Sequence, residues 1–495
     1  MRKYFFIIIA TLLYLTGLLS SFPYILSEFW KPATTFTSLR TIIEYSVMYL
    51  SLLAFCYFLH QNKILKFFSY VIQILLSISF LLSTSCFIVY GTGFNIGIGL
   101  SILSTNINEA KSMSFMFIIP TILTIIYTLI QYKSIQLIDD FKNKKTLIAL
   151  STLWILLPVI FYLKHTYIEN KGGAFMIKSA FYQSNILDSA IKTYEESKLI
   201  SKKSDIKIIK SNNPPTQNII LVIGESVRKQ NMSLYGYDKP TNPYSSKEKN
   251  LTVYPNVVSS ASITNLSVPL ILSSIEPKDF VNNYSKLSNN IITYANKNNY
   301  NTYWYTTQGP AKGITAIANL AKTKEWISGF DDVLYPKVAN ATSKTLNNLI
   351  ILHINGSHPN PCDRTPPDFD EKNLDCYDAS IYYTDTLLKK LYDKYRYTNT
   401  IIIYTSDHGL KIKDNKFLHT DSKESTQVPL FVWYGDKVNP NYILKSASTA
   451  RTQNTIVYPL IVEYMGLEPL KNYKSNKNDF LDLSLNSIKY ENLPE

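Results

Sequence analysis

The sequence predicts a chain in two parts, an N-terminal bundle of membrane-spanning helices and a C-terminal α/β domain built on a parallel sheet. Residues 1–164 are dominated by Ile, Leu, Phe, Tyr and Ser, whereas most Lys, Asp, Asn and Pro residues come later. In the later part, short apolar runs rich in β-branched residues alternate with longer polar segments. The 495 residues also exceed one compact core, so the length agrees with two or three domains.

Five apolar runs predict five membrane-spanning helices, because each approaches the roughly 20 residues that a helix needs to cross a bilayer. The runs are 4–22, 42–59, 67–90, 115–132 and 146–163. One such run alone could be a buried core helix, but five in succession favour a membrane domain. The first follows Met1-Arg2-Lys3 as a signal peptide would, yet no small-residue cleavage pattern follows it, so we expect an uncleaved anchor.

The basic residues predict the orientation. With the N-terminus inside, the cytoplasmic segments hold Arg2, Lys3, Lys63, Lys66, Lys133, Lys142, Lys144 and Lys145, against Lys31, Arg40 and Lys111 outside. Five spans then place the C-terminal domain on the outer side. The net charge of +13 does not indicate nucleic-acid binding, because the basic residues form no arginine-rich stripe. A surface facing anionic lipid fits this charge better.

A connector, 165–217, separates the membrane domain from the domain at 218–495. Its apolar residues recur at helical spacing and predict an amphipathic helix, lying on the membrane or packing on the outer domain. They are Ile186, Leu187, Ala190, Ile191 and Tyr194. The stretch SNNPPTQ then marks the domain boundary.

The four cysteines fall into two pairs. Cys56 and Cys86 lie in apolar runs, whereas Cys362 and Cys376 lie close together in the outer domain. An exported domain permits the second pair to form a disulfide. Closeness in sequence does not establish the Cα separation that a disulfide needs, so this pairing stays open.

Polar residues follow three of the four apolar runs that we interpret as buried strands, 218–223, 349–354, 400–404 and 429–433. Glu225 follows the first, His358 follows the second in LHINGSHP, and Asp407 and His408 end the third in IIIYTSDHG. Parallel sheets carry their chemistry beyond the carboxyl ends of the strands. Each residue alone is a weak signal, but together they suit Zn²⁺, which needs one more donor.

The missing donor is expected between residues 254 and 274. A hydroxyl beside Zn²⁺ has a lowered pKa and becomes a nucleophile near neutral pH. A polar loop whose hydroxyls bond the backbone is the simpler interpretation, and the residues alone do not choose among five candidates. These are Ser259, Ser260, Ser262, Thr264 and Ser267.

At these motifs the chain resembles the phosphoethanolamine transferases of Gram-negative inner membranes, members of the alkaline phosphatase and sulfatase superfamily. GESVRKQNMSLYGYDKPTNP is similar to that family's first signature, NVVSSASITNLSVP to its nucleophile segment, and YTSDHG to its strand with paired metal ligands. The resemblance extends over nearly the whole chain. It implies a C-terminal sulfatase-like domain in the periplasm and a multi-pass anchor in the inner membrane.

The resemblance also implies roles for residues. Glu225, Asp407 and His408 correspond to Zn²⁺ ligands, and Thr264 to the nucleophile that completes the set. Five further residues match positions that contact the phosphoryl group, a second metal, the leaving group or the donor lipid. They are the histidines His358 and His419, the lysine Lys312, and Thr105 with Glu109 in the loop after the third span.

The chain departs from the family pattern in several places. Ser260 and Leu270 stand where two bracing cysteines are common, Leu410 replaces an acidic residue, and Ser101 replaces Asn. One residue is also missing between Asp407 and His419. These changes put loop rigidity and substrate contacts in question more than the zinc chemistry.

The resemblance implies transfer of phosphoethanolamine from phosphatidylethanolamine to lipid A or a core sugar, through a covalent intermediate on the nucleophile, by a monomer. A membrane phosphoglycerol transferase or sulfatase-like phosphohydrolase is the alternative enzyme, since it could keep the zinc set. A noncatalytic envelope-binding scaffold is the alternative outside enzymes. Retention of Glu225, Thr264, Asp407 and His408 together argues against the scaffold.

Overall fold

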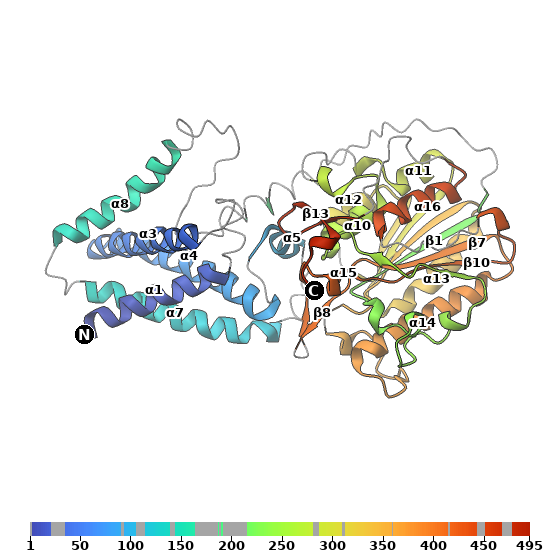
Figure 1. The fold of residues 1–495 in the computed structure, drawn as a ribbon, viewed down its shortest axis with the longest axis horizontal. Helices are drawn as coiled ribbons and strands as arrows, with labels where there is room; N and C mark the ends of the chain where they lie inside the picture. Colours follow the sequence, from blue (N-terminus) through green and yellow to red (C-terminus); the bar gives the residue numbers. More distant parts are fainter. Residues whose placement is uncertain are drawn as a thin grey trace. The chain divides into compact units, whose positions relative to one another are not determined.

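The computed structural model describes fourteen stretches of the chain. They are residues 2–20, 35–90, 94–104, 114–138, 144–163, 187, 190–191, 215–280, 287–308, 312–358, 360–413, 416–442, 451–467 and 478–495 (Figure 1). Two compact units emerge, one of residues 1–99 and 114–190 and the other of residues 100–113 and 191–495. Nearly all of the predicted connector lies outside the described residues.

The first unit is helical, and each predicted apolar run overlaps one of its helices. These helices are α1 (Arg2–Ser20), α3 (Thr35–Gln61), α4 (Lys66–Ser85), α7 (Ile118–Leu137) and α8 (Lys144–Leu163). A π-helix, Cys86–Tyr90, continues α4, and a 3-10 turn, Ser114–Phe117, precedes α7. The short helix α5 (Ile96–Ser104) follows the π-helix.

Aromatic side chains fill the interior of this helical unit. Tyr14 stacks on Tyr49 with ring centroids 4.3 Å apart, and Phe80 stacks on Tyr127 at 4.4 Å. The hydroxyl of Tyr127 donates to that of Tyr49 over 3.2 Å. Stacked rings with a bonded polar tip hold α1, α3, α4 and α7 together.

The outward side of the unit is apolar where a soluble protein would be polar. On α7, six aliphatic residues are between 45% and 63% exposed: Ile118, Ile119, Ile122, Ile125, Ile126 and Leu129. Two described stretches, Lys66–Val89 and Ser114–Leu137, are long and apolar enough to cross a membrane. The predicted count of five spans stays a prediction.

A seven-stranded sheet organises the second unit, in the order β2-β10-β7-β1-β6-β4-β5. The predicted runs form β1 (Asn218–Gly224), β6 (Asn348–His353), β7 (Thr400–Ser406) and β10 (Leu430–Tyr434). The sequence interpretation missed three others, β2 (Leu251–Val253), β4 (Asn301–Thr306) and β5 (Thr323–Trp326).

The expectation of an all-parallel sheet is wrong at one edge. Strands β7, β1, β6, β4 and β5 are parallel, but β10 runs antiparallel to β7, and β2 runs antiparallel to β10. The apolar run of β10 resembles that of a parallel strand because both its faces are buried. Burial on both faces does not reveal strand direction.

Helices cover both faces of the sheet (Figure 1). One face packs against α13 (Leu334–Lys344) and α14 (Cys376–Tyr395), and alternate residues of β1 such as Ile220 and Val222 lie in that core. Four helices lie on the other side of the sheet in Figure 1: α10 (Thr264–Leu272), α11 (Ile291–Lys297), α12 (Lys312–Ala318) and α16 (Val457–Tyr464). Every residue of β1 is therefore buried.

Small elements complete the unit beside the main sheet. They are β3 (Val257–Val258) with β11 (Arg451–Thr452), the hairpin of β8 (Lys411–Lys413) and β9 (Lys416–Leu418), the short helix α15 (Lys423–Thr426), and the hairpin of β12 (Asp479–Leu481) and β13 (Ser487–Lys489). Most of them surround the segment that leads into α10.

Candidate metal and nucleophile site

The register of the central strands brings Glu225 and Asp407 together. Gly224 at the end of β1 pairs with Ser406 at the end of β7, and the amide of Asp407 donates to the carbonyl of Gly224 over 2.9 Å. The next residue of each strand therefore leaves the same edge of the sheet at the same level. Both side chains are fully buried.

The loop after β6 closes over the backbone of Glu225. The amide of Ser357 donates to the carbonyl of Glu225 over 2.9 Å. Gly356 has a φ of +50°, and a Cβ atom there would lie 2.8 Å from the Glu225 nitrogen. Only glycine allows this approach, because any side chain would press on the backbone of Glu225.

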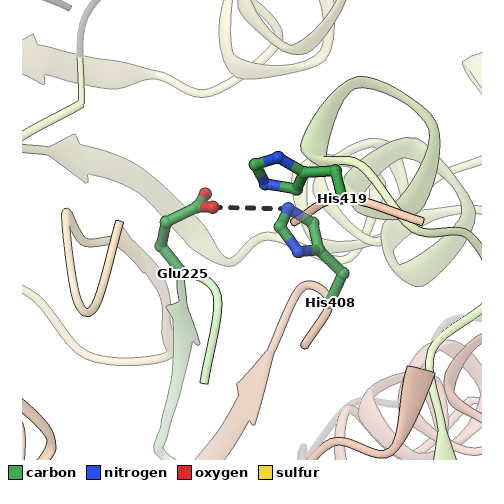
Figure 2. A group of neighbouring side chains, drawn as sticks. All are labelled: Glu225, His408 and His419. Atoms are coloured by element: carbon green, nitrogen blue, oxygen red, sulfur yellow. Dashed lines mark ion pairs between the residues drawn. The ribbon is translucent and has the colours of Figure 1, made fainter. Parts of the chain in front are cut away.

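Four side chains converge at this edge. The hydroxyl of Thr264 donates to Glu225 Oε2 over 3.1 Å and lies 3.2 Å from His408 Nε2. His408 Nε2 lies 3.3 Å from Glu225 Oε1 and 3.3 Å from Asp407 Oδ2. Glu225, His408 and His419 also form a group whose ligand atoms lie within 4.8 Å of one another (Figure 2).

Hydrogen bonding fixes the tautomer of His408. Its Nδ1 lies 2.9 Å from the carbonyl oxygen of Gly409, which can only accept, so Nδ1 carries a proton. In the neutral ring, Nε2 then offers its lone pair toward Thr264, Glu225 and Asp407. An imidazole held by a carbonyl in this way is the usual form of a metal-ligating histidine.

The buried charges around His408 shift one another's pKa values. Burial raises the pKa of Asp407 to about 8, and the charge of Glu225 acts in the same direction. Burial alone would raise the pKa of Glu225 and lower that of His408, but their attraction holds the Glu225 pKa well below its usual value and, with Asp407, raises the His408 pKa to about 9. Two adjacent buried carboxylates need a positive charge between them.

The residues fit a zinc ion. Among the described residues, Asp407 Oδ2 is a buried oxygen without a hydrogen-bond partner. A tetrahedral Zn²⁺ site with ligands at about 2.0 to 2.2 Å has neighbouring donors roughly 3.3 to 3.6 Å apart. The separations of 3.1 to 3.3 Å among Thr264, Glu225, Asp407 and His408 approach that spacing.

The five hydroxyls that the sequence left open have different partners. Ser259 donates to the Ala261 carbonyl, Ser260 to Asn454, Ser262 to Asp421, and Ser267 to the Asp407 carbonyl. Of the five, Thr264 alone donates to the side chain of a predicted metal ligand, since Ser267 bonds the backbone of Asp407. The geometry therefore singles out Thr264 at the first residue of α10.

Two further histidines border the site. The ring of His419 lies edge-on to that of His408 with centroids 4.9 Å apart, and burial together with repulsion from His408 lowers the pKa of His419 to about 3. His358 is half-buried, and Arg364 donates to its carbonyl oxygen over 3.3 Å and lies 3.4 Å from its Nδ1. His419 is therefore neutral at physiological pH, and its ring can accept a hydrogen bond or bind a cation.

Other predicted residues lie partly or wholly outside the described structure. Lys312 is the first residue of α12, but its side chain is not described. Thr105 and Glu109 fall in a stretch outside the described residues. Their roles stay predictions.

Sequence reasoning missed the residues that support the ligands. Gln308, two residues after β4, donates one amide group both to Glu225 Oε2 and to the carbonyl of Ile354, each over 2.9 Å. Ser226 donates to Glu225 Oε1 through its hydroxyl and to Asp407 Oδ1 through its amide. The signal for Gln308 was a polar residue following a strand, which was invisible while β4 itself was unrecognised.

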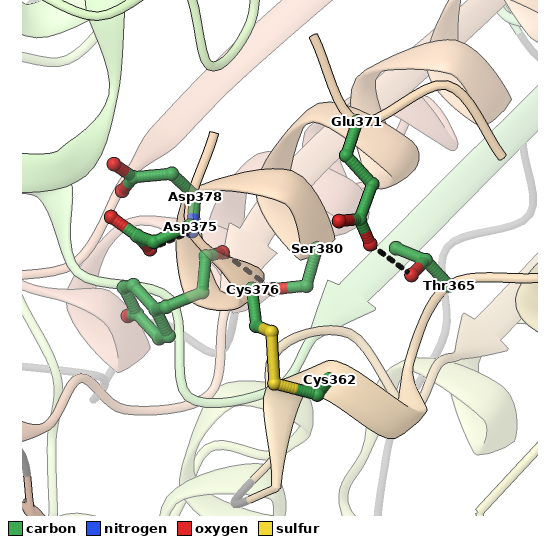
Figure 3. The surroundings of a disulfide bond; sticks show 8 residues. Cys362, Thr365, Glu371, Asp375, Cys376, Asp378 and Ser380 are labelled. Atoms are coloured by element: carbon green, nitrogen blue, oxygen red, sulfur yellow. Dashed lines mark hydrogen bonds between the residues drawn. A yellow bond between two sulfur atoms is a disulfide. The ribbon is translucent and has the colours of Figure 1, made fainter. Parts of the chain in front are cut away.

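The disulfide that the sequence left open is present in the structure. Cys362 and Cys376 are bonded, with Cα atoms 4.7 Å apart. The bond joins the segment that follows His358 to the first residue of α14, beside the Asp375 N-cap (Figure 3). The disulfide therefore restrains the segment that follows His358.

Comparison with known proteins decides the family. The sequence pattern described as Sulfatase matches residues 217–467, slightly more than half of the chain. The chain belongs to the sulfatase family. This match confirms the predicted superfamily and the sulfatase-like character of the C-terminal domain.

Two named proteins are similar to the chain in sequence. The chain is 28% identical over 398 residues to YhbX of Escherichia coli (strain K12), covering 72% of each chain. It is 28% identical over 300 residues to phosphoethanolamine transferase OpgE of the same organism, covering 54% of this chain and 56% of that one.

A solved structure extends the fold similarity into the helical part. The integral membrane protein lipooligosaccharide phosphoethanolamine transferase A (EptA) from Neisseria meningitidis is 16% identical and aligns with a TM-score of 0.57. The alignment covers 85% of this chain and 95% of that one. The helical unit and the sulfatase-like domain therefore recur together in a known membrane protein.

Proposed function

We propose that the protein is a zinc-dependent transferase that moves phosphoethanolamine from phosphatidylethanolamine to an envelope acceptor, lipid A or a core sugar. The observation that carries this proposal is the Thr264 hydroxyl, held 3.1 Å from Glu225 and 3.2 Å from His408 at the carboxyl edge of the sheet. The name of the relative OpgE supports phosphoethanolamine as the group transferred.

Zn²⁺ is the cofactor that the donors suit best. Glu225, Asp407 and His408 would hold it, with Thr264 as the fourth donor, because two carboxylates, an imidazole and a hydroxyl are the oxygen and nitrogen ligands that Zn²⁺ accepts. When bound, Zn²⁺ lowers the pKa of a coordinated hydroxyl and neutralises charge on a phosphoryl oxygen.

The transfer takes two displacements at phosphorus. Thr264 Oγ1 loses its proton and forms a bond to phosphorus, the bond from phosphorus to the diacylglycerol oxygen breaks, and that oxygen takes up a proton in exchange. An acceptor hydroxyl then attacks the same phosphorus, Thr264 Oγ1 leaves with a proton, and phosphoethanolamine passes to the acceptor. We assign His358 and His419 to exchanging these protons and orienting the phosphoryl group.

The lipid substrates explain the helical unit in this proposal. Five spans anchor the protein in the inner membrane and carry the catalytic domain in the periplasm, where donor headgroups and acceptor sugars are both within reach. Outward aliphatic residues on α7 support contact with lipid tails. In this arrangement Thr105 and Glu109 contact the donor headgroup, Lys312 offsets phosphate charge, and the enzyme acts as a monomer.

The mass of the Thr264 peptide tests the proposal. Protein purified from membranes containing phosphatidylethanolamine is digested beside Thr264→Ala, and we expect a phosphoethanolamine adduct on the wild-type peptide only. His358→Ala or His419→Ala slows discharge and raises its occupancy. A glycerophosphate adduct would instead indicate a phosphoglycerol transferase. Absence of any adduct in the zinc-loaded histidine variants would contradict the covalent mechanism.

A further inference from the structure

A buried hydrogen bond joins the two segments that carry Thr264 and His419. The hydroxyl of Ser262 donates to Asp421 Oδ1 over 2.6 Å. The second oxygen of Asp421 accepts the amide of Leu483 over 2.9 Å. Ser262 is fully buried. One carboxylate therefore connects the nucleophile segment (257–264), the histidine segment (418–422) and the C-terminal hairpin of β12 and β13.

The Ser262–Asp421 bond lies two residues before Thr264 in the nucleophile segment. The amide of Ser259 donates to the Thr426 carbonyl over 2.7 Å, and the carbonyl of Ser260 accepts from the amide of Leu481 over 2.8 Å. Beyond them, Ile263 is extended, and its side chain makes no cap at the start of α10. The Ser262 hydroxyl thus makes the side-chain anchor nearest in sequence before Thr264, so it restrains the backbone that aims the nucleophile.

The other end of the bond restrains the histidine segment. Asp421 is two residues after His419, whose ring centroid lies 4.9 Å from that of His408. A hydroxyl that donates to a carboxylate over a short distance makes one of the stronger hydrogen bonds in proteins. Movement at either end is therefore passed to the other, and Thr264 and His419 keep a fixed separation across the site.

We propose that Asp421 is a positioning residue for the transfer, acting through Ser262 to hold Thr264 and His419 in register. This inference rests on the proposed function, because it assigns Asp421 an effect on the reactivity of Thr264. The carboxylate does not touch the reacting atoms. Its contribution is the alignment of the attacking oxygen, where a small displacement has a large effect on rate.

Kinetics of three variants test the proposal in the full-length protein: Ser262→Ala, Asp421→Leu and their combination. Each single change should slow adduct formation on Thr264 roughly tenfold to a hundredfold, with the KM for phosphatidylethanolamine unchanged. The double variant should be no slower than the slower single one, because both changes remove the same bond. Losses that multiply, or a full rate in either single variant, would overturn the inference.

Ser273→Ala is the matched control. It removes an equally buried serine hydroxyl at the far end of α10, bonded to the Pro269 carbonyl over 2.7 Å. This variant should transfer at the wild-type rate. If the rate of the Ser262 and Asp421 variants falls only in step with their unfolding temperature, the role is structural and the inference fails.

Hydrogen exchange gives a readout that needs no turnover. Ser262→Ala should speed amide exchange in the histidine segment, and Asp421→Leu should speed it in the nucleophile segment. Exchange that stays local to each mutation contradicts the coupling, even if the wild type forms no adduct. A wild type without adduct but with reciprocal exchange would instead reject the proposed function and keep the coupling.

Discussion

Two regions of the sulfatase-like unit each bury an aspartate, but the hydrogen-bond partners of the two carboxylates differ. Asp385, in α14, accepts hydrogen bonds on both oxygens, from the amides of Tyr244 and Ser245 and from the Ser245 hydroxyl. Asp407, at the edge of the sheet, accepts on Oδ1 from two amides, while its buried Oδ2 has no such partner among the described residues and faces His408.

The difference separates a structural carboxylate from a candidate ligand. Satisfied oxygens on Asp385 hold the 3-10 turn Ser245–Lys247 against α14 and need nothing further. The open oxygen of Asp407 lies beside a second carboxylate, Glu225, and costs free energy until a cation reaches it. Burial alone does not distinguish these roles, whereas the inventory of hydrogen-bond donors does.

Metal removal should produce the largest effect. A chelator that strips Zn²⁺ from the full-length protein should abolish transfer and destabilise the sulfatase-like unit by about 4 kcal/mol, the value for a ligand present at a thousand times its Kd. Thermal unfolding followed by tryptophan fluorescence measures the shift. Asp385→Asn should show the same shift and Asp407→Asn almost none. An equal shift in all three proteins would place the metal elsewhere.

Substitution of the two aspartates should separate activity from stability. Asp407→Asn should lower the transfer rate by more than about 100-fold, the upper range for a residue that only supports a ligand. It should also remove the bound zinc, measured by elemental analysis of the purified protein. Asp385→Asn keeps the shape of the side chain and should retain both zinc and transfer at growth temperature. Zinc loss in both variants would contradict the distinction between a ligand at Asp407 and a structural carboxylate at Asp385.

The pH dependence of stability should report on Asp385. Burial raises its pKa to about 6, above the value near 3.9 of an exposed aspartate. The stability that this group contributes is complete below pH 4 and is lost as the pH rises through 6, by about 2 to 3 kcal/mol. Unfolding free energies of wild type and Asp385→Asn, measured from pH 4 to pH 8, should diverge accordingly. Parallel curves would show that Asp385 keeps an ordinary pKa.

Removing one donor from each carboxylate site should give the smallest effect. Gln308→Leu deletes the amide that orients Glu225 and should weaken zinc binding about tenfold, as outer partners of metal ligands do. Ser245→Ala deletes a donor to Asp385 and should lower stability by about 1 kcal/mol without changing zinc affinity. Competition with a fluorescent chelator measures the affinities. Unchanged zinc affinity in Gln308→Leu would remove Gln308 from the site.

Much of this site followed from sequence because the chemistry sits at strand ends. The runs before Glu225 and Asp407 are continuous apolar stretches, so their strands and the polar residues after them were visible. Thr264 was one of five candidate hydroxyls until the resemblance selected it, and the structure now gives the other four separate partners.

The remaining features depend on contacts between distant segments. Asp421 reaches Ser262 across 159 positions of sequence, and Gln308 reaches Glu225 across 83. Neither pair has a local pattern. The antiparallel direction of β10 was hidden for a related reason, since a strand buried on both faces shows the same residues in either direction.

Gly356 shows that a residue with no side chain can be as intolerant of substitution as a metal ligand. Its backbone passes so close to Glu225 that every other amino acid would displace that residue. In a library of random mutants sorted for the proposed transfer activity, missense codons at position 356 should therefore be depleted as strongly as those at Glu225 or Asp407. A map of intolerant positions would score this glycine as catalytic, although it donates and accepts no proton and binds no metal.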